Sequence, residues 1–240
     1  MTSHTELQRT LATAAPPANG QAISRSSCCL FHGIGKDDIA SFMASGVVRA
    51  FARGRIIVRA GDPGTHLYIL KTGAADYIRA APEGQQVLII RLAPSDTVGL
   101  GTILDKPVGY IGTAETLEDT EVYAWEHRQV RQFAAKHPLL AENALRITLE
   151  YIRLYSDRHL ALVTNNAEDR LAGTLMQLAA RTGHHHTKGL EINITNEALA
   201  ALADVGPFTA SRLLQKWERK GAVEKRRGKL VILAPEKMLT

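Results

Sequence analysis

Residues 202–217 read LADVGPFTASRLLQKW, and a glycine-proline pair interrupts their helical pattern at Gly206-Pro207. Glycine is accepted as a helix N-cap and proline is favoured at the first helical position, so the pair predicts that a second helix begins here. The apolar residues of this helix fall at i, i+3, i+4 and i+7, which predicts one buried face. They are Ala210, Leu213, Leu214 and Trp217.

The preceding segment NEALAALA, 196–203, is predicted to be a helix that Thr195 caps. Two helices joined by a three-residue turn, with polar side chains at the start of the second, are typical of a helix-turn-helix. Arg212 can bond to guanine and Gln215 to adenine or a phosphate, whereas Phe208 could contact a thymine methyl or pack on the neighbouring helix. The helix residues expected to contact double-stranded DNA are Phe208, Thr209, Ser211, Arg212 and Gln215.

The segment after this helix is basic. AVEKRRGKLVIL, 222–233, is typical of a hairpin that turns at Arg227-Gly228, and its Lys225, Arg226 and Arg227 fit a wing on the phosphate backbone. From residue 165 onward the chain carries 12 Lys/Arg and 8 Asp/Glu, which is +4 of the total net charge of +5. This uneven charge favours a polyanionic partner.

The first half of the chain has a different pattern. Short β-type runs, separated by turn residues, predict an antiparallel roll or barrel. They are IIV at 56–58, LYIL at 67–70, ADYI at 75–78, VLIIRL at 87–92 and TEVYAW at 120–125.

A short helix at 127–137 is followed by a long one, predicted from Leu139 to about Val163. Residues close to heptad spacing on the long helix predict a line that a second copy of the chain would cover; the alternative is that the line packs on the chain's own β domain. They are Leu145, Leu149, Ile152, Tyr155, His159 and Leu162. Beyond the hinge at 164–166 we expect a helix at 167–181, a polar loop at 183–189 and a strand LEINI at 190–194.

This order of elements resembles the CRP/FNR family of transcription regulators over roughly residues 29–233. RGRIIVRAGDPGTHLYILKTG at 53–73 is similar to the family's roll signature, with Gly54, Gly61, Asp62 and Gly73 in place. The resemblance implies an α+β fold with four parts: a tail at 1–26, an antiparallel β-roll (a jelly roll like the cyclic-nucleotide-binding domains) at 27–137, a dimerisation helix at 138–164 and a winged helix-turn-helix at 165–240. It implies a homodimeric, sequence-specific regulator of the bacterial type that works with RNA polymerase.

The chain departs from members of the family that bind cyclic AMP. Those members hold the ribose with the Glu of Gly-Glu-Leu-Gly and the phosphate with the Arg of a later Arg-Ser. In GLGTILDKPVGYIGTAE, 99–115, these positions hold Leu100, Tyr110 and Ile111, and an unpaired polar group would cost about 1–3 kcal/mol. We therefore expect a small-molecule effector other than cyclic AMP, in a pocket formed by Gly99, Leu100, Tyr110, Ile111, Tyr155 and Ser156; the alternative is an effector-independent protein whose roll is a scaffold.

No cofactor is assigned from the sequence. Cys28 and Cys29 are its only cysteines, so a four-cysteine iron–sulfur cluster is excluded, and we expect the pair to be buried, with a thiol sensor as the alternative. Haem stays open, because His32, His66, His127 or His159 could ligate iron. His184-His185-His186 favours a solvated loop over a metal site.

Other classes of protein are disfavoured. A metal-dependent β-roll enzyme would need a His-x-His pair, but His66 stands alone, so we expect no enzyme. The chain has no run of 18 apolar residues and no signal-peptide core, so we expect a cytoplasmic protein without a membrane partner.

Overall fold

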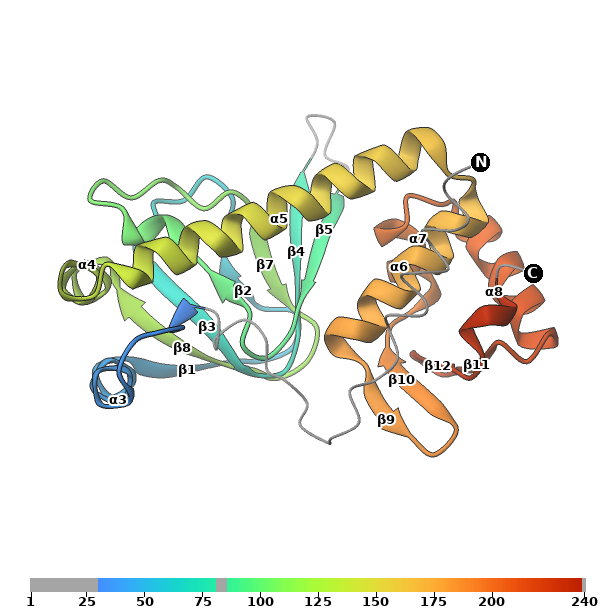
Figure 1. The fold of residues 1–240 in the computed structure, drawn as a ribbon, viewed down its shortest axis with the longest axis horizontal. Coiled ribbons are helices and arrows are strands. Elements are labelled where there is room, and N and C mark those ends of the chain that lie inside the picture. The colour runs from blue at the N-terminus through green and yellow to red at the C-terminus, as the bar shows by residue number, and fades with distance from the viewer. Residues whose placement is uncertain (1–29, 81–85, 239–240) are drawn as a thin grey trace. The chain divides into compact units, whose positions relative to one another are not determined.

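The structure is a computed structural model that describes residues 30–80 and 86–238 (Figure 1). The chain divides into two compact units, one ending at Ser156 and the other beginning at Asp157, and each is described by itself. The predicted tail at 1–26 and the pair Cys28-Cys29 lie outside the described residues.

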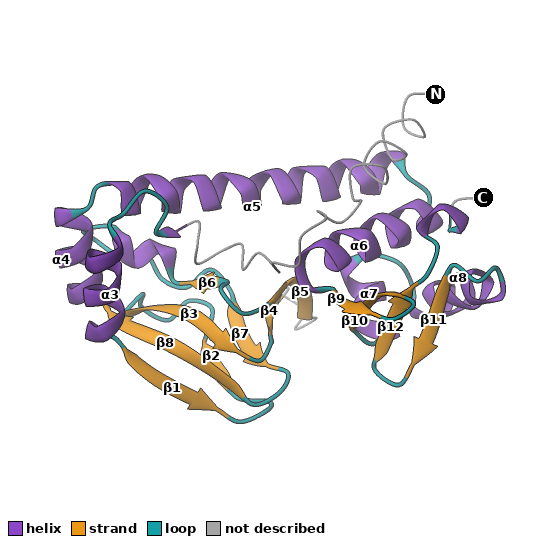
Figure 2. Ribbon diagram, turned by 60° about the horizontal axis from the view of Figure 1, so that its bottom comes forward, coloured by secondary structure: helices purple, strands orange, loops and turns teal. Residues whose placement is uncertain are grey.

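Two four-stranded antiparallel sheets form the roll of the first unit (Figure 2). Their strand orders are β1-β8-β3-β6 and β2-β7-β4-β5. The strands are β1 (Val47–Phe51), β2 (Ile56–Val58), β3 (His66–Thr72), β4 (Ala75–Ala80), β5 (Gln86–Leu92), β6 (Thr97–Val98), β7 (Thr113–Thr116) and β8 (Thr120–Glu126).

The middle of β3, residues 67–70, is an uninterrupted apolar run because both faces of the strand are buried there. Leu67 and Ile69 enter one core, beside the helices, whereas Tyr68 and Leu70 enter the core between the two sheets. Side chains alternate across a strand, so one run of apolar residues serves two cores.

Helices close the outer core of the roll. They are α3 (Lys36–Ser45), α4 (His127–Lys136) and the first half of α5 (Leu139–Thr164), and a short 3-10 helix, η1 (Leu100–Ile103), follows β6. The fully buried Trp125 stacks on Phe42 with ring centroids 4.8 Å apart and donates a hydrogen bond to the Phe42 carbonyl at 2.8 Å. Leu140, Ala144 and Ile147 of α5 pack into the same core, which fixes the start of α5 on the roll.

The described part of the second unit contains the end of α5, three further helices and a small antiparallel sheet of order β11-β12-β10-β9. The elements are α6 (Ala167–Thr182), β9 (His184–His186), β10 (Gly189–Asn193), α7 (Asn196–Leu202), α8 (Pro207–Arg219), β11 (Val223–Arg226), β12 (Lys229–Ile232) and the 3-10 helix η2 (Pro235–Lys237). Thr195 caps α7 as predicted, since its hydroxyl accepts a hydrogen bond from the Ala198 N–H at 3.2 Å.

The predicted α+β fold class is confirmed, as is the long helix, and the five predicted strands of the roll all form. The loop predicted at 183–189 is wrong in part, because 184–186 form β9, which pairs with β10. Strands β1, β6 and β7 and helix α3 were not predicted; β6 and β7 are short, and long-range pairing supplies their hydrogen bonds. In the described parts of the chain, no helix has the length and apolar character needed to cross a membrane.

Candidate nucleic-acid interface

The turn between α7 and α8 consists of the four residues 203–206. Asp204 has a φ of 50°, in the left-handed region that Asp and Asn tolerate better than most residues. Val205 is buried, and Gly206 is the extended N-cap of α8, which begins at Pro207. The geometry is that of the predicted helix-turn-helix.

One face of α8 is locked into the second unit. Its buried residues are the four predicted from the periodicity: Ala210, Leu213, Leu214 and Trp217. The Trp217 Nε1 donates to Glu168 Oε1 at 3.0 Å, and Lys216 Nζ donates to the same carboxylate at 2.8 Å. These two hydrogen bonds from α8 to the first turn of α6 hold α8 in one rotation about its axis, so its other side faces outward.

The outward side of α8 carries the side chains predicted to contact DNA. Phe208, Arg212 and Gln215 are exposed, and Thr209 and Ser211 are half-buried. Arg212 makes no hydrogen bond or ion pair within the described residues, and the first turn of α8 has no acidic residue. Phe208 does not pack on the neighbouring helix, since its side chain is 93% exposed; that alternative is wrong.

Two arginines stabilise the turn through hydrogen bonds, and neither role could be predicted from the sequence. Arg158, near the end of α5, donates from Nε to Asp204 Oδ2 at 2.7 Å. Arg170, on α6, donates to the carbonyl oxygens of Asn165 at 2.9 Å, Asp204 at 3.0 Å and Ala203 at 3.3 Å. The backbone of the turn is thus held from outside the two helices that it joins.

The hairpin of β11 and β12 (Val223–Ile232), here called the wing, turns at Arg227-Gly228 as predicted. Its Arg226 is held by acidic neighbours. The guanidinium lies 2.8 Å from Glu224 and 3.7 Å from Glu191, with Nη1 3.1 Å from His186 Nε2. The hydrogen bond from Arg226 also lowers the pKa of Glu224 below its ordinary value.

Arg227 differs from the other cations of the wing. Lys225 pairs with Glu218 at 3.3 Å, and Lys229 pairs with Glu191 at 2.6 Å. The exposed side chain of Arg227 forms no such pair with any described residue. Of the cations on the wing, Arg227 therefore has its charge least compensated by neighbours.

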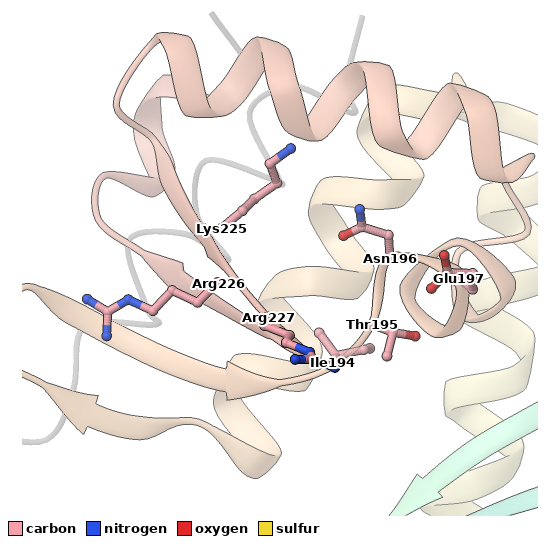
Figure 3. Close-up of a pocket in the computed structure, with 8 residues that line it drawn as sticks. Ile194, Thr195, Asn196, Glu197, Lys225, Arg226 and Arg227 are labelled. Carbon is pink, nitrogen blue, oxygen red and sulfur yellow. The ribbon is translucent and has the colours of Figure 1, made fainter.

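A hollow of about 440 Å³ lies between the wing and the start of α7 (Figure 3). It is lined by Ile194, Thr195, Asn196, Glu197, Lys225, Arg226, Arg227 and Gly228. Figure 3 shows the Arg226 side chain extending away from the hollow, whereas Arg227 ends beside Ile194. An arginine and small polar side chains are groups that bind phosphate oxygens.

The six residues predicted to form a line on α5 are all exposed: Leu145, Leu149, Ile152, Tyr155, His159 and Leu162. At 3.6 residues per turn, however, Tyr155 and Leu162 lie about 80–100° around the helix from Leu145. Ser156 and Val163 fall on the line instead, and Val163 is 75% exposed. We call the corrected line the α5 seam; its members, at spacings of four and three, are Leu145, Leu149, Ile152, Ser156, His159 and Val163.

Of the residues predicted to form an effector pocket in the roll, Gly99 and Tyr110 lie next to each other, whereas Leu100 and Ile111 have different surroundings, and Tyr155 and Ser156 are exposed on α5. Tyr110 is buried in the core between the sheets, where its hydroxyl donates to the His66 carbonyl and accepts from the His66 N–H, each at 3.0 Å. Gly99, with a φ of 89°, lies so close to the His66 carbonyl that a β-carbon would collide with it. Leu100 packs in the outer core, and Ile111 is 66% exposed.

The histidines considered as haem ligands lie apart in the sequence, whereas His184, His185 and His186 all belong to β9. His66 has its Nε2 3.1 Å from Arg49, and burial, then the Arg49 charge, lowers its pKa. His127 Nε2 lies 3.0 Å from the Leu104 carbonyl, and His159 is on the α5 seam. Across residues 30–80 and 86–238, no three His, Cys, Asp or Glu side chains cluster in a way that could hold a metal ion.

Comparison with known proteins matches both units. The cyclic nucleotide-binding domain family matches residues 48–137, and the Crp-like helix-turn-helix domain family matches residues 169–240. The CRP-like cAMP-activated global transcriptional regulator of Mycobacterium tuberculosis is 26% identical over 212 residues, which cover 88% of this chain and 94% of the relative. The cyclic AMP receptor protein of Thermus thermophilus is 28% identical over 195 residues, which cover 81% and 87%.

Among solved structures, FixK2 from Bradyrhizobium japonicum has the same fold, with a TM-score of 0.70 at 17% identity over 81% of this chain and 96% of that one. The helix-turn-helix, the roll and the two domain matches lead to one conclusion: the chain belongs to the CRP/FNR family of DNA-binding transcription regulators.

Proposed function

We propose that the protein binds two-fold symmetric DNA sites as a homodimer, with α8 in the major groove and the wing on the phosphate backbone. The observation that carries the proposal is the outward side of α8, where Arg212 and Gln215 are exposed beside a first turn without acidic residues. Arginine and glutamine can each form two hydrogen bonds with a purine edge. The proposed phosphate contact of the wing is Arg227, which has no acidic partner among the described residues. Lys225 and Arg226 add positive charge next to it on the wing.

The proposed dimer contact is the α5 seam. Four of its six members are Leu, Ile or Val, and all of these are more than half exposed in the single chain, including Ile152 at 54%. Two parallel helices bury such a line by interdigitating the residues at these spacings. Ser156 and His159 are polar positions within the line, and polar positions fix the register of paired helices.

A charge in the seam tests this proposal. We expect Ile152→Asp to give monomers in sedimentation velocity and to abolish tight binding to a symmetric operator, because two buried carboxylates would face each other. Arg146→Asp is the matched control, since it places the same side chain on an exposed position off the seam. A dimeric Ile152→Asp protein would show that the subunits meet elsewhere.

We propose that the roll does not bind cyclic AMP. Tyr110 stands where relatives have a phosphate-binding arginine, and both hydrogen-bonding roles of its hydroxyl are used by His66. An effector other than cyclic AMP is the first alternative. The separation of Leu100, Tyr110 and Ile111 favours the second, a roll that acts only as a scaffold.

As the protein partner we propose RNA polymerase, and as the place of action the cytoplasm, since a transcription regulator acts where polymerase meets DNA. The domain boundaries proposed are those given above, with the dimerisation helix at 138–164. A genome-wide footprint of bound sites tests these points together, because sites clustered next to promoters support contact with polymerase and sites scattered without regard to promoters contradict it.

A further inference from the structure

Phe208 has no role in the core of its own domain. It is the second residue of α8 and is 93% exposed, whereas Ala210, Leu213, Leu214 and Trp217 of the same helix are buried. Among the described residues from 165 onward, it is also the one large hydrophobic side chain that is exposed. A solvent-exposed phenyl ring at the start of this helix indicates that it contacts a partner outside the chain.

The surroundings of Phe208 identify the chemistry of that partner. Arg212 lies one turn further along the same side of α8, and the first turn carries no carboxylate. Because no second large hydrophobic side chain is exposed among the described residues from 165 onward, the apolar surface is too small to dock a protein. A single ring beside a cation fits a polyanion that carries isolated apolar groups.

We infer that Phe208 is a specificity-determining residue that contacts the C5-methyl group of thymine in each half-site of the operator. The inference rests on the proposed function. The thymine methyl is the one apolar group that base pairs display in the major groove. Phe208 and Arg212 are about 6 Å apart along the helix axis, and base pairs are about 3.4 Å apart, so the thymine lies one or two base pairs from the base that Arg212 contacts.

Deoxyuridine provides the test, because it lacks only the methyl group. An operator is first selected with the wild-type protein from a random duplex library, and each symmetric pair of thymines is then replaced by deoxyuridine. Burial of one methyl group corresponds to about fourfold in affinity, so one pair of replacements should weaken the wild-type dimer by about fifteenfold. Phe208→Ala should bind the thymine and deoxyuridine operators equally, while Phe208→Leu should retain part of the difference.

Arg219→Ala is the control on the same helix: it should weaken binding to all duplexes and keep the deoxyuridine penalty. The inference, but not the proposed function, is overturned if deoxyuridine weakens Phe208→Ala as much as the wild type. It is also overturned if no thymine pair of the operator can be replaced with a loss of affinity. If the wild-type protein enriches no motif from the library, both the inference and the proposed function are overturned. Circular dichroism checks that Phe208→Ala is folded, as expected for a fully exposed side chain.

Discussion

Removing one arginine from the wing should change the salt dependence of DNA binding, and the structure indicates which arginine. Arg226 and Arg227 are neighbours in the same hairpin, yet Arg226 lies within 2.8 Å of Glu224 and Arg227 has no acidic partner among the described residues. We predict that Arg227→Ala removes a phosphate contact and that Arg226→Ala does not. Both variants lose one positive charge, so each is the control for the other.

The expected magnitude follows from counterion release. Each phosphate contact contributes about 0.9 to the slope of log K against log salt, and a dimer has two wings, so Arg227→Ala should reduce the slope by about 1.8. Over a fourfold rise in salt, from 50 to 200 mM, the wild type should then lose about twelvefold more affinity than Arg227→Ala. Specific and random duplexes should be affected alike.

Fluorescence anisotropy with a labelled operator and a random duplex, at five or more salt concentrations, measures these slopes. The selected operator sequence should be unchanged in both variants, because phosphate contacts carry no sequence information. Equal slopes for Arg226→Ala and Arg227→Ala would refute the reasoning from ion pairing. A reduced salt slope for Arg226→Ala alone would mean that a DNA phosphate replaces Glu224 as the partner of Arg226.

Three further predictions concern the roll and the packing of α8. Calorimetry with cyclic AMP and cyclic GMP should detect no binding tighter than about millimolar, because no cation stands at position 110, and micromolar binding would contradict the pocket assignment. Tyr110→Phe should lower the free energy of unfolding by about 1–3 kcal/mol in urea, because it leaves the backbone N–H and carbonyl of His66 without their partner. An unchanged urea midpoint of unfolding would show that water replaces the hydroxyl. Burial alone would raise the pKa of Glu168, but the hydrogen bonds from Lys216 and Trp217 outweigh it and hold the pKa below its ordinary value. This stabilisation is present above the ordinary pKa of a glutamate and is lost as the pH falls through the lowered pKa. Glu168→Gln should therefore remove that part of the acid sensitivity, and an identical acid unfolding profile would contradict this.

The helix-turn-helix and the long helix could be predicted from the sequence because their signals are local. Gly206-Pro207 sets the start of α8 through backbone preferences, and the spacing of Leu213, Leu214 and Trp217 sets its buried face. Turn residues at short intervals likewise predicted the roll. Such signals act within a few residues, so they survive without knowledge of the rest of the chain.

Other features depend on contacts between residues far apart in the sequence, and only the tertiary structure decided them. The 184–186 segment became a strand because β10 pairs with it, although its three histidines have no strand pattern. Arg226 and Arg227 are indistinguishable in sequence, but Glu191, on another strand, lies within reach of Arg226.

The same holds for the candidate sites in the two units. Leu100, Tyr110 and Ile111 lie within one short stretch, yet they belong to two cores and the surface, because the rest of η1 and a loop separate Leu100 from the other two. Periodicity placed Phe208 on the polar side of α8, but its exposure depends on whether a neighbouring helix covers it. Sequence periodicity determines which side of a helix is apolar, and the packing of distant segments decides what that side, and the opposite one, will contact.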